Sequence, residues 1–586
     1  MCGIAGLMTR GAAPSPAVLD SFAAALGHRG PDGQGRYAKD NTALVQTRLA
    51  IIDLATGDQP IFEPGGCVLV ANGEIYNYIE LRAAMPDVRF ATQSDSEIPL
   101  HLYRRCGLDF AKDLRGMYAI AIHDPAANRL VLARDPFGIK PLYYAETPHG
   151  FAFASEPRAL IAAGFVCAVL SPQQRNELLQ VQFTTGRDTI FEGIHRVLPG
   201  EMLIVENGRI AERRRIGALP EDGPRRIDAH AARTKLDEVW QDSVNIHQRS
   251  DVPYGMFLSG GVDSSAVLAM MARLNTRPVQ AFTAGFSGTA ASDERALAQK
   301  VARSFGAEHT EIDFTEDDFW KILPLVAAAM DDPTADYAVL PTWKLAEAAR
   351  GAGLKVILSG EGGDELFGGY GRYRSAMRPW WLGGKRMRRR GTFDGLDILR
   401  EKPSGWRDGM SASEAAAKKL GLTRLQIAQA VDCAGWLPND LLIKLDRCLM
   451  AHGIEGRTPF LDREVAAFAY RLPDNLKIAN GLGKSLLRKW LAEHAPAAEP
   501  FSKKRGFTVP VGEWVARRGA MLGELVARQE CIRELCRTGS IETLFRAAAD
   551  KRHGFAAWSL LFYALWHRRH IEGAGSGGDI GEALSG

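Results

Sequence analysis

The sequence predicts a chain of two domains, an α+β domain built on antiparallel strands followed by an α/β domain built on a parallel sheet. Length is the first reason, because 586 residues exceed what one hydrophobic core supports. The second reason is that short apolar runs separated by turns, such as 118–122, 130–133 and 151–154, are typical of a meandering antiparallel sheet. The third is that helical patterns alternate with short apolar strands from Ala231 onward.

The boundary between the domains follows from composition. Pro, Gly and charged residues crowd between Glu212 and His230, so we expect a linker at 212–230, a first domain at 1–211 and a second at 231–572. The last residues, 573–586, are rich in Gly and Ser and are predicted to be disordered.

Charge and cysteine usage limit the partners and the compartment. A formal net charge of +3 gives no global field for nucleic acid or a membrane, and the basic run 385–390 is interpreted as a solvated face. Eight scattered cysteines form neither a Cys-x-x-Cys pair nor a zinc pattern, which favours a reduced cytoplasmic compartment. No apolar run reaches the length of a membrane span, and no signal peptide precedes Cys2.

The second domain is organised around a glycine-rich turn. Residues 252–258 form a predicted strand and 266–273 open a helix, so Ser259-Gly260-Gly261-Val262-Asp263-Ser264-Ser265 is a strand-to-helix turn. Free N–H groups of a helix start and three hydroxyls suit a phosphate or pyrophosphate, and Asp263 suits Mg²⁺ beside it. It is not a Walker A loop, because the Gly483-Lys484-Ser485 string has Ile478 in place of the first glycine. The alternative is an ordinary Gly-Ser turn.

A second loop carries three carboxylates. The predicted strand 354–358 leads into Ser359-Gly360-Glu361-Gly362-Gly363-Asp364-Glu365. Repulsion between these carboxylates costs free energy unless a cation offsets it or catalysis requires it. A metal site shared with Asp263 is therefore one interpretation. An acidic surface loop is the other.

The first domain opens with Cys2, which becomes N-terminal once Met1 is removed. Its own α-amine can then act as general base for its thiol. A buried structural cysteine is the alternative for Cys2 taken alone. The His28-Arg29-Gly30-Pro31-Asp32-Gly33 loop, Arg48, Asn72-Gly73-Glu74 and Asp95 follow along the chain.

These residues together resemble the glutaminase domain of class II, N-terminal-nucleophile amidotransferases, over roughly the first 200 residues. The resemblance implies a four-layer αββα sandwich with Cys2 as nucleophile and with Asn72 and Gly73 stabilising the oxyanion. It also implies a set of glutamine-binding residues: Arg48, Leu49, Ala50, Ile51, Ile52, Asn72, Gly73, Glu74 and Asp95. Taken singly, Arg48 could instead form a surface ion pair, Asn72-Gly73 a hairpin turn and Asp95 a cap.

The glycine-rich turn of the second domain resembles the pyrophosphate loop of ATP pyrophosphatases that form adenylates. The loop that follows Leu358 resembles glutamine-hydrolysing asparagine synthetases. These resemblances imply a doubly wound parallel sheet with added helices, Mg²⁺ held by Asp263 and Asp364, and Glu361 acting near an acyl-adenylate. Lys484 would stabilise charge on the transferring groups, an ordinary surface lysine being the alternative. The implied ATP-binding residues are Leu258, Ser259, Gly260, Gly261, Asp263, Ser264, Ser265, Ala284, Ser359 and Gly360.

The chain as a whole is therefore similar to glutamine-hydrolysing asparagine synthetases. That family implies a cytoplasmic ligase with glutamine, aspartate and ATP as substrates and Mg²⁺ as cofactor; a homodimer is left open. An amidotransferase of the same architecture that amidates another carboxylate, such as a peptide or a sugar acid, is the alternative. A non-catalytic regulator that binds glutamine and ATP is a third hypothesis, against which intact Cys2, Asp263 and Asp364 argue.

Overall fold

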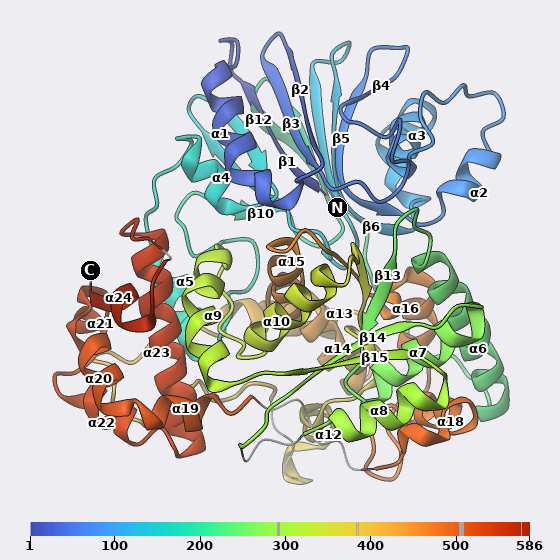
Figure 1. The fold of residues 1–586 in the computed structure, drawn as a ribbon. Helices are drawn as coiled ribbons and strands as arrows, with labels where there is room; N and C mark the ends of the chain where they lie inside the picture. Colours follow the sequence, from blue (N-terminus) through green and yellow to red (C-terminus); the bar gives the residue numbers. More distant parts are fainter. Residues whose placement is uncertain are drawn as a thin grey trace.

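The structure is a computed structural model that describes residues 2–289, 293–382, 384, 386–502, 509–575 and 577–585. Figure 1 shows a sheet-rich first domain, blue to cyan, above a second domain coloured green to red. The described N-terminus lies where the two domains meet. The two-domain fold predicted from the sequence is confirmed.

Within the described residues, the strands of the first domain form two antiparallel sheets. Their bounds are β1 Cys2–Thr9, β2 Gly33–Lys39, β3 Thr42–Arg48, β4 Ile61–Phe62, β5 Val68–Ile75, β6 Gly116–Asp124, β7 Arg129–Arg134, β8 Tyr143–Thr147, β9 Gly150–Ala154, β10 His195–Arg196, β11 Glu201–Glu206 and β12 Arg209–Arg215. One sheet has the order β10-β8-β9-β1-β3-β2 and the other β12-β11-β7-β6-β5-β4.

Strand periodicity explains why these sheets stack between helices. The helices are α1 Pro16–Leu26, α2 Tyr78–Ala83, α3 Ile98–Cys106, α4 Pro157–Ala162 and α5 Pro172–Val181. On β1, Ile4 and Met8 point into the cluster between the sheets, whereas Ala5 and Leu7 pack with α1 and α4. On β5, alternate residues likewise pack between the sheets or against α3. Because successive side chains of a strand face opposite ways, both faces are buried and the order is αββα, as expected.

The first domain extends a little further than the sequence suggested. Strand β12 continues to Arg215, beyond the boundary expected at residue 211, because Arg215 still pairs with Glu201 on β11. Helix α6, Ala229–His247, begins where Asp228 accepts hydrogen bonds from the N–H groups of His230 and Ala231, both at 2.9 Å. The connection between the domains is therefore residues 216–228.

The second domain contains a parallel sheet. Its strands are β13 Tyr254–Phe257, β14 Gln280–Gly285, β15 Glu308–Asp313, β16 Val356–Leu358 and β17 Glu455–Arg457, in the order β15-β14-β13-β16-β17. The order steps outward in both directions from β13, and ligands of such sheets bind beyond the carboxyl ends of the strands at this switch point. The loops that follow β13 and β16 are those singled out from the sequence.

One group of helices surrounds this sheet, and a second group follows residue 509. The first group is α6, α7 Val262–Leu274, α8 Arg295–Ser304, α9 Glu316–Ala329, α10 Val339–Gly351, α11 Gly363–Phe367, α12 Gly371–Met377, α13 Asp408–Lys419, α14 Arg424–Ala434, α15 Leu442–Met450, α16 Arg463–Tyr470, α17 Asp474–Lys477 and α18 Ser485–His494. The second is α19 Val511–Arg517, α20 Gly519–Arg528, α21 Glu530–Leu535, α22 Ser540–Arg546, α23 Lys551–His570 and α24 Ile580–Ser585.

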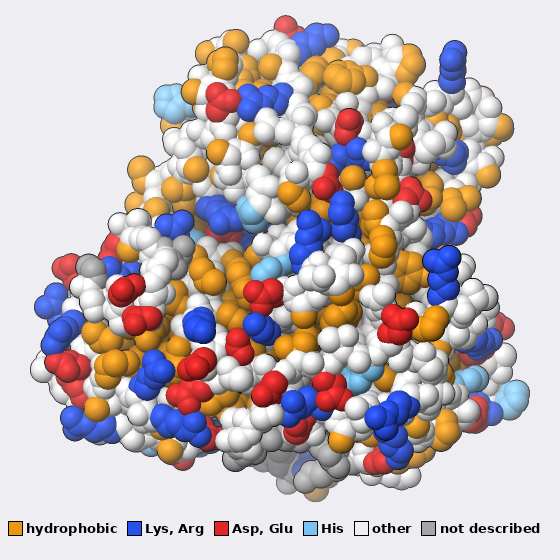
Figure 2. Space-filling model, in the orientation of Figure 1, with side chains coloured by type: hydrophobic (Ala, Val, Ile, Leu, Met, Phe, Trp, Pro, Cys, Tyr) orange, Lys and Arg blue, Asp and Glu red, His pale blue; other side chains and the backbone are white. Residues whose placement is uncertain are grey.

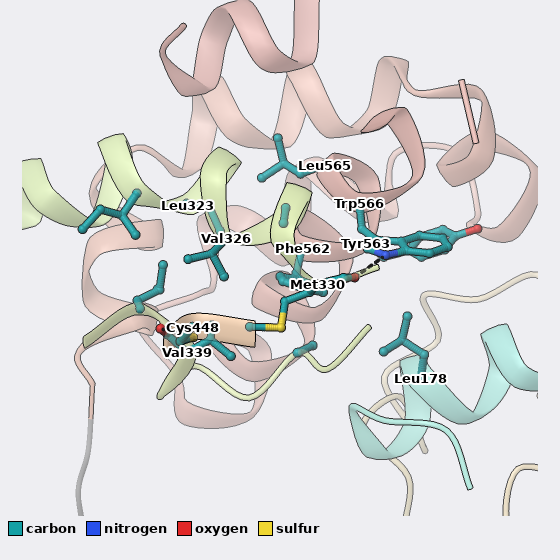
Figure 3. Packing of buried hydrophobic residues seen from close by; sticks show 14 of the residues in the cluster. Leu178, Leu323, Val326, Met330, Val339, Cys448, Phe562, Tyr563, Leu565 and Trp566 are labelled. Carbon is teal, nitrogen blue, oxygen red and sulfur yellow. Dashed lines mark hydrogen bonds between the residues drawn. The ribbon is translucent and has the colours of Figure 1, made fainter. Parts of the chain in front are cut away.

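Helix α23 holds residues 330–335 in place. This segment leads directly to Asp336, which lines a cavity of the second domain. Figure 3 shows Phe562 and Trp566 packed around Met330, with the indole N–H of Trp566 donating to the Met330 carbonyl at 2.8 Å. The indole of Trp558 donates to the Ala335 carbonyl at 2.6 Å. Leu178 of α5 belongs to the same buried cluster, so this core joins both domains.

The end of the chain differs from the expected disordered tail. Helix α24 buries Ile580 and Leu584, and the Leu584 carbonyl accepts a hydrogen bond from Gln529 Nε2 at 2.7 Å. The Gly- and Ser-rich composition predicted disorder, but Ile580 and Leu584 are four residues apart and lie on one face of a short helix. Ser576 and Gly586 lie outside the described residues.

Surface charge agrees with the small net charge. On the face drawn in Figure 2, acidic and basic side chains are interspersed over the lower domain rather than gathered by sign. In the described part of the chain, no helix has both the length and the apolar content needed to cross a membrane.

A buried ion-pair network joins the two domains. The Arg29 guanidinium donates to both carboxylate oxygens of Asp446, at 2.8 and 2.9 Å, and to Glu156 at 2.7 Å. Arg447 adds bonds to Asp446 at 2.8 Å and Asp331 at 2.9 Å. All of these groups are buried, so none can exchange its partner for water.

Asp446→Asn should destabilise the chain by about 3–5 kcal/mol, because it leaves Arg29 and Arg447 short of a buried counter-charge. The midpoint of thermal unfolding should fall by several degrees. Arg36→Ala, which removes the exposed pair with Asp20, is the control and should change it little. Equal midpoints for the two variants would show that the buried network does not stabilise the structure.

Candidate active sites

The first site surrounds Cys2 at the start of β1. The Cys2 side chain is 7% exposed, and Gln46 Nε2 lies 2.8 Å from its sulfur. Its main-chain nitrogen, which becomes the α-amine when Met1 is removed, donates to Asn72 Oδ1 at 3.1 Å. Burial raises the pKa of the thiol, although hydrogen bonds with the Leu49 backbone and the Gln46 side chain lower it. A base at the thiol itself is therefore needed for attack. Met1 lies outside the described residues.

Asn72 and Gly73 lie on β5, and Asn72 contacts Cys2. Asn72 is fully buried, and its Nδ2 has no hydrogen-bond partner among the described residues. An unsatisfied buried donor costs about 1–3 kcal/mol, and an oxyanion formed at Cys2 is a group that could satisfy it. A Cβ at Gly73 would lie 2.1 Å from the Met117 carbonyl oxygen. Only glycine fits here.

Arg48 closes another side of this site. Strand pairing places it opposite Cys2, and its Nη1 donates to Asp58 at 2.7 Å. Asp58 is 82% exposed, so a substrate carboxylate could replace it at small energetic cost. The following residues Leu49, Ala50, Ile51 and Ile52 are buried, and the Ala50 N–H donates to Asp32 of the His28–Gly33 loop at 2.8 Å.

Glu74 and Asp95 form an acidic floor that contacts the second domain. Arg457 Nη2 of β17 lies 3.4 Å from Glu74 Oε1, and Arg457 Nε lies 2.5 Å from Glu455. Burial and the nearby Glu455 and Asp95 raise the pKa of Glu74 well above its usual range. Burial also raises the pKa of Asp95 to about 6, although the Ile75 N–H donates to it at 2.7 Å. The floor can receive a cationic ammonium group.

The second site begins at the turn after β13. Leu258 is buried, and Gly260 has a φ of +70°, which glycine tolerates. Ser264 Oγ lies 3.1 Å from the Ser259 N–H and 3.0 Å from the Ser259 hydroxyl, and Gly261 caps α7. Ser265 Oγ is buried with no hydrogen-bond partner among the described residues. The turn thus presents hydroxyls and a helix start to one point, as an anion site requires.

Lys484 joins the two loops of this site. It caps α18 with a φ of +59°, and its Nζ contacts Asp263 and lies 2.7 Å from Asp364 Oδ1. The lysine is buried, and its two carboxylate neighbours raise its pKa against the opposing effect of burial. Lys484 is not a surface lysine.

Glu361 stands beside a second buried lysine. Lys444 Nζ on α15 lies 2.9 Å from Asp336 and 4.0 Å from Glu361. Burial raises the pKa of Glu361, and Lys444 opposes that shift. A carboxyl group with a raised pKa beside a fixed cation is suited to proton transfer.

Both loops open into one cavity of about 1080 Å³. It is lined by most of the predicted ATP-binding residues together with Glu361, Asp364 and Lys484; Ser265 is absent from the lining. Cys2 is not part of this cavity, so the structure contains two separate sites. Sequence reasoning assigned no role to Gln46, Lys444 and Arg457, whose partners Cys2, Asp336 and Glu74 lie far away in the chain. Arg488 also lines the cavity without a predicted role.

The two carboxylates proposed as metal ligands do lie together. A Cβ at Gly363 would lie 2.4 Å from Asp263 Oδ1, and Lys484 contacts both Asp263 and Asp364. Within the described residues, no group of three or more His, Cys, Asp or Glu side chains could hold a metal without help. Two carboxylates beside this glycine-rich turn fit a magnesium ion that takes its other ligands from a nucleotide and water.

The fold and the two sites define a class of protein: a glutamine amidotransferase domain joined to an ATP-dependent ligase domain. Residues 1–215 match the glutamine amidotransferase domain family, and residues 235–568 match the asparagine synthase family. The chain belongs to the asparagine synthase family.

Relatives cover nearly the whole chain. A putative glutamine-hydrolysing asparagine synthetase of Mycobacterium tuberculosis is 32% identical over 98% of each chain. Asparagine synthetase 1 of Bacillus subtilis is 30% identical over 98% of this chain and 97% of its own. Asparagine synthetase B of Escherichia coli is 30% identical over 86% and 81%. A solved glutamine phosphoribosylpyrophosphate amidotransferase from B. subtilis covers 53% of this chain and 81% of its own at 18% identity and a TM-score of 0.29, which is too weak to carry an argument.

Glutamine hydrolysis should lose efficiency as pH falls through about 6, because Asp95 then becomes protonated and no longer attracts an ammonium group. Because the pKa of Asp95 is raised to about 6, its carboxylate is charged above that pH and neutral below it. We expect kcat/KM for glutamine, measured from pH 5 to 8, to show this acidic limb. Asp95→Asn should have a low kcat/KM and should lose the part of the limb near pH 6, while the decline that comes from protonation of the Cys2 amine remains. Equal wild-type values at pH 5 and 7 would remove Asp95 from glutamine binding.

Proposed function

We propose that this chain is a glutamine-dependent asparagine synthetase in which the site residues named above act as the resemblance implies. The observation that carries the proposal is that one fold holds both halves of the chemistry. Cys2 lies against Asn72 in the first domain, while the phosphate-binding turn, Lys484 and Glu361 meet in one cavity of the second. A non-catalytic binder would not need Cys2 and Asn72 Nδ2 in this arrangement.

The first half-reaction would release ammonia from glutamine. The Cys2 amine, oriented by Asn72 Oδ1, takes the thiol proton, and the sulfur attacks the side-chain amide carbon. Asn72 Nδ2 and the Gly73 N–H stabilise the resulting oxyanion. Collapse breaks the C–N bond and expels ammonia, which carries the transferred proton, and water then hydrolyses the thioester to glutamate. Arg48 holds the α-carboxylate of glutamine, while Glu74 and Asp95 hold its ammonium group.

The second half-reaction would activate aspartate. The β-carboxylate attacks the α-phosphorus of ATP and forms β-aspartyl-AMP while pyrophosphate leaves. Ser259, Ser264 and the N–H groups of the turn hold the departing pyrophosphate, with Lys484 offsetting its charge. Ammonia then attacks the acyl carbon and AMP leaves, giving asparagine. Glu361 accepts the proton that the attacking ammonia loses.

Magnesium would be held by Asp263 and Asp364 together with nucleotide oxygens. When bound, it would neutralise charge on the triphosphate. The residues of the chain keep the other tasks: Lys484 separates the two carboxylates, and Gly360 and Gly363 let the two loops approach, since a Cβ at either would lie within 3 Å of Asp263.

Assembly and location stay predictions from the family resemblance. A homodimer would be recognised by light scattering of the purified chain at twice 64.0 kDa. A cytoplasmic location would be checked by fractionation of the native host.

The acceptor is the part of the proposal most open to a direct test. With ATP, Mg²⁺ and glutamine, we expect aspartate to give AMP, pyrophosphate and asparagine, whereas glutamate and N-acetylaspartate give none, since a pocket for two charged groups rejects partners that leave them unpaired. Excess EDTA should stop the reaction. Asp364→Asn should lose most of its rate because a charged ligand is gone. The measurement is pyrophosphate release paired with chromatography of the amide. If another acid gives the amide and aspartate does not, the chain is an amidotransferase for that acid.

Cys2→Ala should abolish glutamine hydrolysis while synthesis from ammonium salts continues near the wild-type rate, because only the ammonia source depends on the thiol. Glutamate formation and ammonium-dependent asparagine formation are measured side by side. A Cys106→Ala variant, at an exposed cysteine, is the matched control and should keep both activities. Residual glutaminase activity in Cys2→Ala would eliminate Cys2 as the nucleophile.

A further inference from the structure

Arg388 turns into the cavity, although the run 385–390 was expected to be a solvated basic face. Its φ is +46°, a left-handed conformation uncommon for a residue with a side chain. Lys385 lies outside the described residues, and Arg386 and Arg389 are exposed. Arg388, in contrast, is partly buried and lines the same cavity as Glu361 and Lys444. Arg390 of the same run also lines the cavity but is exposed. The left-handed backbone at Arg388 points this partly buried guanidinium inward.

The Arg388 guanidinium lies on an aromatic platform. Its Cζ is 3.9 Å from the centre of the Trp436 ring and 5.3 Å from that of Phe183. Across the described residues, no hydrogen bond or ion pair involves Arg388. Burial lowers its pKa, so the surrounding carboxylates do not compensate the charge.

The two carboxylates whose charges act on Arg388, those of Asp432 and Asp440, each form a hydrogen bond with another residue. Asp432 accepts hydrogen bonds from Arg372 at 2.6 and 2.9 Å. Asp440 accepts one from the Thr334 hydroxyl. The guanidinium donors of Arg388 are therefore available to a ligand in the cavity.

Arg388 is linked to the reacting centre through two side chains. The Trp436 indole N–H donates to the Tyr370 hydroxyl at 3.3 Å, and that hydroxyl donates to Glu365 at 2.6 Å. Glu365 belongs to the acidic loop that also carries Glu361 and Asp364. The phosphate-binding turn after β13 has its own cation in Lys484. The turn therefore does not require Arg388 as its cation.

The wall that carries Arg388 is fixed from both sides. Arg407 donates to the Met387 carbonyl at 2.9 Å. Further along, the N–H groups of Thr392 and Phe393 donate to the Gln180 carbonyl at 3.0 Å and to its Oε1 at 3.2 Å. A Cβ at Gly391 would lie 1.9 Å from Gln180 Oε1, so the close approach needs glycine. Helix α5 of the first domain therefore holds the wall, and the guanidinium is presented in place.

We propose that Arg388 anchors the acceptor acid by a second carboxylate, the one that does not react. The inference rests on the proposed function and adds the substrate class: an acid with two carboxylates, one beside Glu361 and Lys444 and the other on Arg388. In aspartate the second group is the α-carboxylate. A planar guanidinium binds a carboxylate through two parallel hydrogen bonds, and Trp436 holds the plane in position.

The test measures binding, so it does not require turnover. Aspartate is titrated calorimetrically into the chain with Mg²⁺ and α,β-methylene-ATP, which cannot adenylate the acid because its methylene bridge prevents the release of pyrophosphate. Arg388→Met keeps a long apolar side chain against Trp436 but removes the charge. Arg388→Lys keeps the charge but cannot form the two parallel hydrogen bonds of a guanidinium. We expect Kd for aspartate to rise at least tenfold in Arg388→Met and less in Arg388→Lys. Arg389→Met, at the exposed neighbour outside the cavity lining, is the matched control and should bind as wild type.

An analogue identifies which group Arg388 holds. The acid 3-aminopropanoate lacks the α-carboxylate of aspartate, so its weak binding should be the same in wild type and Arg388→Met. Glutaminase activity should be unchanged in every variant and reports that the chain is folded. Unchanged aspartate binding, an equal loss for 3-aminopropanoate, or a loss confined to the nucleotide analogue would each overturn the proposal.

Failure of the proposed acceptor gives a different result. If wild type does not bind aspartate, the variants are compared with the acid that supports pyrophosphate release, and the anchor stands only if Arg388→Met weakens that acid. If no carboxylic acid binds, both the anchor and the proposed function are wrong.

Discussion

One buried guanidinium connects Cys2 of the first domain to the second domain. Arg29 Nε donates to the Cys2 carbonyl at 3.3 Å, while its other nitrogens pair with Asp446 and Glu156. Because these charges are removed from water, each is tolerable only with its partners in place. The network therefore favours one relative position of the domains. Strand β17 adds a second link: Arg457 contacts Glu74 in the glutamine site, and its carbonyl accepts the Ser359 N–H at 2.8 Å at the start of the acidic loop. Each candidate site is built partly on the other domain.

Local chemistry explains what could be predicted from the sequence. The turn at 259–265 was recognisable because glycine, hydroxyls and a helix start act within a few residues. Cys2, Asn72 and Gly73 were recognisable as a set, although only the structure shows Asn72 Oδ1 on the Cys2 nitrogen. The short apolar runs at 118–122, 130–133 and 151–154 predicted strands, which are β6, β7 and β9. The family resemblance predicted how the sheets stack between helices.

What was missed depends on contacts between distant residues. Arg29 and Asp446 are 417 positions apart, and neither shows in its own surroundings that it is buried. Arg388 belonged to a basic run typical of a solvated surface, and its inward direction follows from a left-handed backbone and from Trp436. Helix α24 was hidden by flanking glycines, since two apolar residues form a stable helix only when a core receives them. Tertiary packing decided all three.

The account's central claim is that both sites act in one reaction, with ammonia made at Cys2 used in the second cavity. The most direct measurement supplies amide-¹⁵N glutamine together with an equal concentration of unlabelled ammonium, ATP, Mg²⁺ and aspartate. Mass spectrometry of the asparagine then gives the source of its amide nitrogen. The account predicts that most of the asparagine carries ¹⁵N. Asparagine that is mainly unlabelled while glutamine is consumed would contradict it, because the two sites would then work independently.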